Sequence, residues 1–366
     1  MNNFIVMGLL LAFSCTSFAE LHFRAITKTL DENVPNILKT HGAPGAAIAI
    51  VEQDKILGFK FYGFSNVEKQ SIFTQNVMFN VGSVSKVATA WGVMQLVQDG
   101  AVNLDQPINT YLKRWKIPDS EFGTDKVTLR NIMSHTSGLS LGPYQGWDKP
   151  AGLSIADSLN GQNNGAGEVK LIHEPDTKWS YSGGGYSVIQ LLIEDVSGQS
   201  FNDYMIEKVF NPLGMNTTTF DVLTSTMQVS ATPYDQDGNP TSMLYFTATA
   251  AAGMHTTTHD MALFTLTILK NETGMFNGTK ILSAELINTM IQPVDVTGGR
   301  WSMSYVVDAD NQSLGFAGFN RGWIALTRAV VGSNYGYVIL INSSIGAVSN
   351  EIDSLILKTA SELKIP

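Results

Sequence analysis

Apolar runs near both ends of the chain have the lengths and boundaries of β-strands. Near the N-terminus they cover residues 44–51 and 56–63, and a short polar turn separates them. Near the C-terminus they cover residues 322–331 and 335–342, again with a turn between them. Short apolar runs divided by turn residues predict β-hairpins. We expect the first and last strands of the chain to pair in one antiparallel sheet.

Helical spacing of apolar residues dominates the rest of the sequence. The segments with apolar positions three or four residues apart are 30–39, 87–99, 129–134, 186–197, 201–209, 260–269, 284–291 and 351–363. The first and the last of them are expected to cover the sheet. This order of elements predicts an α+β fold with no linker that would separate independent domains. We expect one domain over residues 20–366, with an α/β lobe at about 20–80 and 300–366 and a helical lobe at about 81–299.

Composition and charge exclude several classes of partner. The chain has 366 residues and a formal net charge of −9, and no basic run occurs in it. An acidic chain without a basic patch is a poor ligand for nucleic acid or for an anionic membrane surface. We therefore expect a small-molecule or peptide substrate, and no nucleic-acid partner.

The N-terminus has the features of a secretory signal peptide. Residues 4–13 are apolar, and the small residues Ser17 and Ala19 fit the −3 and −1 positions of a cleavage site. The apolar run is too short to span a bilayer comfortably. We expect a signal peptide at residues 1–19, cleavage after Ala19, and an exported protein, periplasmic or secreted, without a membrane span in its mature chain.

Metal and thiol chemistry have little support in the sequence. Cys15 is the only cysteine, and it lies in the segment expected to be removed. His255 and His259 have the spacing of a metal pair but lack the adjacent glutamate of a zinc-protease helix. We expect no metal and no organic cofactor.

Ser83 and Lys86 are the strongest candidates for catalysis. They stand three residues apart where an extended segment turns at Gly82 into an apolar helix, so their side chains share one helix face. An amine in that position can take the hydroxyl proton, which turns the serine into a nucleophile. Burial on an apolar helix would lower the pKa of Lys86 toward neutrality. The Ser83 N–H at the helix start would stabilise an oxyanion. The alternative is that Ser83 caps the helix and Lys86 lies on the surface.

Several ordered motifs place these residues in a family. They are Gly42-Ala43-Pro44-Gly45-Ala46-Ala47, Phe79-Asn80-Val81-Gly82-Ser83-Val84-Ser85-Lys86, Leu104-Asp105-Gln106-Pro107-Ile108, residues 127–139 with Ser134-His135-Thr136-Ser137-Gly138-Leu139, Tyr181-Ser182-Gly183-Gly184-Gly185-Tyr186, and Asn211-Pro212-Leu213-Gly214-Met215. Together they resemble the serine β-lactamase and penicillin-binding-protein superfamily over nearly the whole expected mature chain. Within it, the likeness is to the class C-like hydrolases that include D-amino peptidases and family VIII esterases. The resemblance implies the β-lactamase-like fold.

The resemblance also implies site roles. Tyr181 stands where the family's second-motif tyrosine stands, and it would shuttle a proton between Ser83 and the leaving group. His135 is interpreted as a structural residue, because its segment forms a tight turn in the family. Gly183 occupies the position of an asparagine that usually holds the substrate amide.

The third motif of the family, on the strand that flanks the site, corresponds here to residues 316–318 and also departs from the family pattern. Phe316, followed by Ala317 and Gly318, occupies the position of a cationic or polar residue that contacts a substrate carboxylate. The backbone N–H of Phe319 would be the second oxyanion donor, and Arg321 is a candidate replacement cation.

Two functions follow from these observations. The first is an exported serine hydrolase that forms an acyl-enzyme on Ser83 and cleaves an ester or amide, with weak or absent β-lactamase activity. The second is a catalytically weak binding or scaffold protein that kept the fold. The altered third motif favours the second function, whereas the presence of Ser83, Lys86 and Tyr181 together favours the first.

Overall fold

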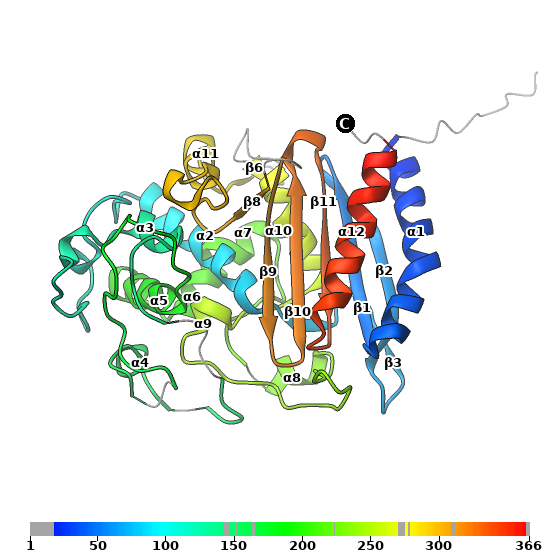
Figure 1. The fold of residues 1–366 in the computed structure, drawn as a ribbon, viewed down its shortest axis with the longest axis horizontal. Coiled ribbons are helices and arrows are strands. Elements are labelled where there is room, and N and C mark those ends of the chain that lie inside the picture. Colours follow the sequence, from blue (N-terminus) through cyan, green and yellow to red (C-terminus); the bar gives the residue numbers. More distant parts are fainter. Residues whose placement is uncertain are drawn as a thin grey trace, which may run out of the picture.

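The structure is a twisted antiparallel sheet with a helical lobe beside it (Figure 1). It is a computed structural model that describes residues 18–141, 146–150, 152–162, 165–222, 224–269, 275–276, 279–308 and 312–363. The β-lactamase-like α+β fold predicted from the sequence is confirmed. The first 17 residues of the expected signal peptide lie outside the described residues.

The sheet joins the two ends of the chain. Its strand order is β3-β2-β1-β11-β10-β9-β8. The strands are β1 (Gly45–Glu52), β2 (Lys55–Asn66), β3 (Ser71–Ile72), β8 (Val306–Asp308), β9 (Ser313–Asn320), β10 (Trp323–Val330) and β11 (Tyr335–Ile341). Strands β1 and β11 pair antiparallel at the centre, with Ala46 opposite Ile341. Both predicted hairpins, β1–β2 and β10–β11, are present.

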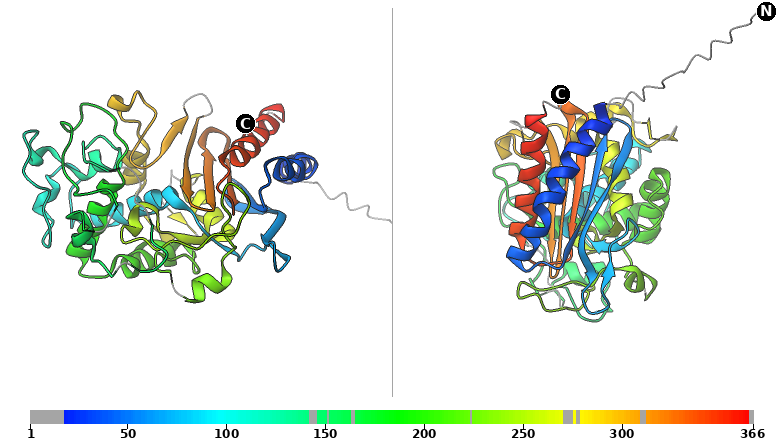
Figure 2. Two further views of the ribbon diagram at one scale, coloured as in Figure 1. Left: turned by 60° about the horizontal axis from the view of Figure 1, so that its bottom comes forward. Right: turned by 90° about the vertical axis from the view of Figure 1, so that its right-hand side faces the viewer.

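Both faces of the central strands are buried, and the alternation of side chains divides the core in two. On β1, Ala47 and Ala49 face one hydrophobic cluster, whereas Ile48 and Ile50 face the other. Helices α1 (Phe18–His41) and α12 (Gly346–Glu362) lie side by side on one face of the sheet, as Figure 2 shows. Both contribute buried apolar side chains to the second cluster. Helix α10 (Thr258–Leu269) contacts β1, β10 and β11, and its buried apolar residues belong to the first cluster. Strand period explains this division, because successive residues point to opposite faces.

The helical lobe surrounds one deeply buried helix, α2 (Ser85–Gln98). Every residue from Ser85 to Leu96 is buried, which accounts for apolar residues on all sides of the helix. The other helices outside the sheet layers are α3 (Leu129–Met133), α4 (Ile155–Leu159), α5 (Gly183–Ser197), α6 (Phe201–Met205), α7 (Asn211–Leu213), α8 (Thr224–Val229), α9 (Thr249–Ala252) and α11 (Ala284–Ile291). Two short ladders complete the fold: β4 (Met78–Asn80) with β5 (His255–Thr257), and β6 (Met275–Phe276) with β7 (Thr279–Lys280).

Several element boundaries differ from the sequence-based predictions. Helix α1 is longer than the predicted segment 30–39, and α12 begins at Gly346 rather than at residue 351. Segment 201–209 divides into α6 and a π-helical turn, Ile206–Phe210. None of the helices in the described part of the chain is both long and apolar enough to cross a membrane.

Strand β9 meets the start of α2 through two glycines. A Cβ atom at Gly318 would lie 1.9 Å from the Val81 carbonyl oxygen and 2.9 Å from the Ser83 nitrogen. A Cβ atom at Gly82, where φ is +50°, would lie 2.6 Å from the Phe319 nitrogen. Only residues without a side chain allow two backbones to approach this closely. The two glycines therefore determine how near β9 comes to Ser83.

We expect Gly318→Ala to destabilise the protein. The added methyl group would overlap a backbone oxygen that cannot move away independently, and overpacking of this kind costs about 1–3 kcal/mol. Gly346→Ala is the matched control, because a Cβ atom there has no neighbour within 4 Å and φ is not in the left-handed region. The free energy of unfolding in urea is the measurement. Equal values for the two variants would contradict the close approach of β9.

Candidate active site

Ser83 lies on a 3₁₀ turn, Gly82–Val84, that leads into α2. Two buried polar side chains hold this turn. Asn80 Oδ1 accepts a hydrogen bond from the Gly82 N–H at 2.9 Å. Ser85 donates to the Gly82 carbonyl at 2.6 Å and accepts from the Met254 N–H at 2.9 Å. The half-buried Ser83 hydroxyl is therefore presented from a rigid backbone rather than from a mobile loop.

Lys86 is buried directly beside the serine. Its Nζ lies 3.3 Å from Ser83 Oγ and donates to the Ala251 carbonyl at 2.6 Å. The side chain is 2% exposed, and burial lowers its pKa from 10.5 to about 7. The rings of Tyr181 and Tyr186 flank the amine, with centroids 5.0 and 5.5 Å from Nζ. An amine with a pKa near 7 is available as a base at neutral pH.

Tyr181 approaches the same hydroxyl from the helical lobe. Its Oη donates to Ser83 Oγ at 2.8 Å. The following residue, Ser182, caps α5: its hydroxyl accepts from the Gly185 N–H at 3.0 Å and donates to the Ser140 carbonyl at 2.8 Å. Burial raises the pKa of Tyr181 to about 12, although the hydrogen bond to Ser83 opposes this shift. Tyr181 is thus a phenol at neutral pH and can donate a proton.

His135 packs against the ring of Tyr181. It adopts a left-handed conformation, with φ at +60°, and its ring centroid lies 4.3 Å from that of Tyr181. Its Nδ1 accepts a hydrogen bond from the Ser182 N–H at 3.2 Å, whereas Nε2 has no partner among the described residues. Burial, assisted by the nearby Lys86, holds the pKa of His135 well below its usual value. The imidazole is therefore neutral, as a structural residue would be.

The two expected oxyanion donors lie on the segments that the glycines bring together. Ser83 N belongs to the turn before α2, and Phe319 N follows Gly318 on β9. The Phe319 side chain is exposed, and its backbone nitrogen would lie 2.6 Å from a Cβ atom on Gly82, the residue before Ser83. Two N–H groups beside a serine hydroxyl can stabilise negative charge that develops on a carbonyl oxygen.

Gly183 and Phe316, which the sequence predicts to contact the substrate, both make contacts within the protein. Gly183 is the first residue of α5, and its N–H donates to the Leu141 carbonyl at 2.9 Å. Phe316 is only 5% exposed and packs edge-on against Trp301, with ring centroids 5.5 Å apart. Its side chain belongs to a buried ring cluster, so it offers a substrate neither charge nor a hydrogen bond.

Arg321 is already engaged by neighbouring loops. Its guanidinium donates to Asp148 Oδ1 at 2.8 Å and to Ser242 Oγ at 2.9 Å. These contacts connect the β9–β10 turn with two other loops. A substrate carboxylate would have to compete with Asp148 for the arginine, although both side chains of this ion pair are exposed.

The structure adds residues that the sequence alone did not single out. The Ala251 carbonyl binds Lys86, and any residue type has such a carbonyl, so no motif could reveal it. Trp179 and Trp301 pack beside Tyr181, each with a ring centroid 6.2 Å from its ring. Proximity of Trp179 to Tyr181 in sequence could have suggested the first contact. The second joins residues 120 positions apart and has no local signal.

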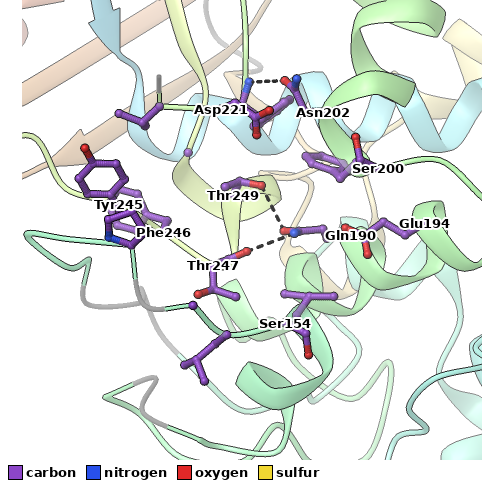
Figure 3. A pocket seen from close by; sticks show the side chains of 18 of the residues that line it. Ser154, Gln190, Glu194, Ser200, Asn202, Asp221, Tyr245, Phe246, Thr247 and Thr249 are labelled. Atoms are coloured by element: carbon purple, nitrogen blue, oxygen red, sulfur yellow. Dashed lines mark hydrogen bonds between the residues drawn. The ribbon is translucent and has the colours of Figure 1, made fainter. Parts of the chain in front are cut away.

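A pocket of about 510 Å³ lies apart from these residues (Figure 3). Its lining residues include Trp147, Gln190, Asp221, Tyr245 and Thr249, and none of the three catalytic candidates lines it. Helix α9 contributes to both places, since its carbonyls bind side chains of α2 while Thr249 borders the pocket. Within the described ranges, no cluster of three or more histidine, cysteine or acidic side chains could hold a metal ion.

Comparisons with known proteins identify the family and the fold. The sequence profile of the β-lactamase family matches residues 30–360. PbpX of Bacillus subtilis (strain 168), which is named as a penicillin-binding protein, is 29% identical over 220 residues, covering 60% of this chain and 52% of that protein. The chain spans about half the length of the curated relatives it matches.

Two solved structures share the fold. A penicillin-binding protein homologue from Pyrococcus abyssi, described as octameric, superposes with a TM-score of 0.76 at 21% identity, covering 92% of this chain and 77% of that one. A β-lactamase/D-alanine carboxypeptidase from Pseudomonas syringae superposes with a TM-score of 0.74 at 19% identity, covering 91% and 99%. With the profile match over most of its length, the chain belongs to the β-lactamase family of serine hydrolases.

Proposed function

We propose that this protein is an exported serine hydrolase that forms an acyl-enzyme on Ser83 and cleaves an ester or amide. One observation supports it above all: a buried amine with a pKa of about 7 and a protonated phenol both reach the same serine oxygen, at 3.3 and 2.8 Å. This arrangement supplies a base, an acid and a nucleophile without a metal or an organic cofactor.

Acylation begins with proton transfer from Ser83 to the neutral amine of Lys86. The serine oxygen forms a bond to the substrate carbonyl carbon, and the carbonyl oxygen becomes an oxyanion facing the N–H groups of Ser83 and Phe319. The tetrahedral intermediate then expels the leaving group, which takes a proton from Tyr181. The Lys86 ammonium returns the proton to the Tyr181 phenolate, so both residues are ready for the next step.

Deacylation reverses these roles with water as the nucleophile. Tyr181 takes the proton of a water molecule that attacks the ester carbonyl while it passes its own proton to the neutral amine of Lys86. When the acyl product leaves, the Lys86 ammonium gives that proton to the Ser83 oxygen. The same constellation therefore serves both half-reactions.

The substrate proposed for this site is an ester or amide without a carboxylate beside the scissile bond, as for an esterase or a D-amino peptidase. Phe316 offers no cation, Gly183 offers no amide side chain, and Arg321 is paired with Asp148. The relative from Pseudomonas syringae carries β-lactamase and D-alanine carboxypeptidase in its name, both of which are acyl-transfer activities at amides. Export remains a proposal that rests on the N-terminal sequence.

Covalent labelling tests the proposed function. A fluorophosphonate probe should label wild-type protein on Ser83, and the Ser83→Ala variant should remain unlabelled and inactive because the nucleophile is absent. Tyr181→Phe should keep the fold and the label but slow turnover of a short-chain ester by roughly 10²–10⁴-fold. Far-ultraviolet circular dichroism of the variants is the control for folding. Absence of label on wild-type Ser83 would favour the binding or scaffold alternative.

The pH dependence follows from the lowered pKa of Lys86. Burial disfavours the ammonium form, so the amine is neutral above its pKa of about 7 and protonated below it. We expect kcat/KM for an uncharged ester to fall roughly tenfold per pH unit below that value and to level off above it. A profile that stays flat from about pH 5 to about pH 9 would exclude Lys86 as the base.

Substrate preference can be measured directly. A p-nitrophenyl ester should have a higher kcat/KM than a chromogenic cephalosporin, whose carboxylate finds no cation at Phe316. A hydrogen bond to a charged group contributes about 1.5–3 kcal/mol, which corresponds to roughly a 10- to 150-fold difference. Efficient cephalosporin hydrolysis that is lost in Arg321→Ala would instead show that Arg321 has taken over carboxylate binding.

A further inference from the structure

An aromatic cluster borders the proton donor of the active site. Trp301 is at its centre. The Trp301 ring centroid lies 5.2 Å from that of Trp179, 5.4 Å from His135, 5.5 Å from Phe316 and 6.2 Å from Tyr181. The rings come from four separate segments of the chain, so the cluster exists only in the folded protein.

Two members of the cluster reach the surface. Trp179 is 38% exposed and Trp301 is half-buried, whereas His135 and Phe316 are buried beneath them. The two indoles, called here the tryptophan pair, are inclined by 33° to each other. Solvent-facing tryptophans of this kind can bury a large apolar area against a ligand at little entropic cost. The tryptophan pair is therefore an apolar surface at the edge of the site.

The position of Tyr181 determines which part of a substrate meets this surface. The phenol lies 2.8 Å from Ser83 Oγ. In the mechanism proposed above, it gives its proton to the leaving atom. That atom must come within hydrogen-bond distance of Tyr181 Oη. The rest of the leaving group then extends over the surface that borders Tyr181, where both indoles lie 6.2 Å from the phenol ring, centroid to centroid.

The uncharged rings of the cluster favour an uncharged ligand. Among the described residues of the ring cluster, none carries a charge at neutral pH, because burial keeps His135 neutral. Lys86, the amine beneath Tyr181, is 2% exposed and has a pKa of about 7. A carboxylate placed against the rings would lose water without gaining a partner among them, whereas an aromatic ring would gain apolar contact. The cations next to the pair in sequence, Lys178 and Arg300, are exposed to solvent.

We propose that the tryptophan pair, Trp179 and Trp301, binds an uncharged aromatic leaving group and determines the specificity of the hydrolysis. The proposal rests on the acyl-enzyme chemistry proposed for Ser83. It assigns the pair to the alcohol or amine side of the scissile bond, and the acyl side extends away from Tyr181.

Acetate esters of three alcohols test the proposal. Benzyl acetate, ethyl acetate and the acetate of 4-(hydroxymethyl)benzoate all give the same acetyl-enzyme, so their kcat/KM values differ only in acylation. We expect benzyl acetate to exceed ethyl acetate by roughly tenfold or more. The added carboxylate should lower kcat/KM below that of benzyl acetate.

Substitutions of the two tryptophans show whether the tryptophan pair causes the preference for benzyl acetate over ethyl acetate. Trp179→Ala and Trp301→Ala should each reduce the benzyl-to-ethyl ratio by at least roughly threefold, with a smaller change for ethyl acetate. Trp301→Leu retains apolar packing against Phe316 and should give the same loss of ratio if Trp301→Ala folds poorly. Trp147→Ala is the control, since Trp147 lines the separate pocket of Figure 3 and should keep the wild-type ratio.

Three outcomes would overturn the proposal. The first is a wild-type kcat/KM for benzyl acetate that is close to that for ethyl acetate. The second is an equal loss of kcat/KM for both esters in the tryptophan variants. The third is a higher kcat/KM for the carboxylate ester than for benzyl acetate. Each of these results is meaningful once the fluorophosphonate probe labels wild-type Ser83. A protein that is not labelled would instead refute the acyl-enzyme function itself, so the two failures are distinguishable.

Discussion

The burial of one amine is the constraint on which the active site depends. Lys86 lies on α2, a helix enclosed on all sides, and its Nζ contacts one carbonyl, one hydroxyl and the faces of two tyrosine rings. A charge in such surroundings is costly, so the amine loses its proton more readily than in water. The same packing that stabilises the helical lobe therefore creates the base that Ser83 requires.

The fold brings the rest of the site to that amine. Pairing of β1 with β11 joins the chain ends, and β9 then lies two strands from β11, where Gly318 touches the turn that carries Ser83. The capped start of α5 brings Tyr181 to the same hydroxyl from the helical lobe. The site thus lies at the junction between sheet and helical lobe, and neither part contains it alone.

Local features of the fold could be predicted from the sequence, and those that depend on distant contacts could not. The two hairpins and α11 follow from apolar spacing and turn residues, which act over a few positions. The three-residue spacing of Ser83 and Lys86 likewise puts both on one helix face. The full length of α1 was not predictable, because its first turns have weak apolar spacing and are stabilised by packing against the sheet.

The aromatic cluster is a part of the site that could not be predicted from the sequence, because it depends on contacts between distant residues. From the sequence, Phe316 is a substrate-facing residue that has lost a charge. In the structure Trp301 packs against the Phe316 ring, and Phe316 is buried. The apolar surface that solvent can reach is therefore formed by Trp301 and Trp179 rather than by Phe316. No spacing rule connects residues 181 and 301, so this surface emerges only when the loops after α11 and before α5 pack together.

Direct titration of Lys86 tests the central claim. Nuclear magnetic resonance of protein labelled at the lysine ζ-nitrogen, with the signal assigned by Lys86→Arg, measures the pKa of this amine without reference to any substrate. The buried environment predicts a midpoint at about 7, whereas an ordinary lysine titrates near 10.5. A Lys86 signal that keeps its proton until the pH approaches the ordinary value would contradict the account, because the amine could not then serve as the base for Ser83.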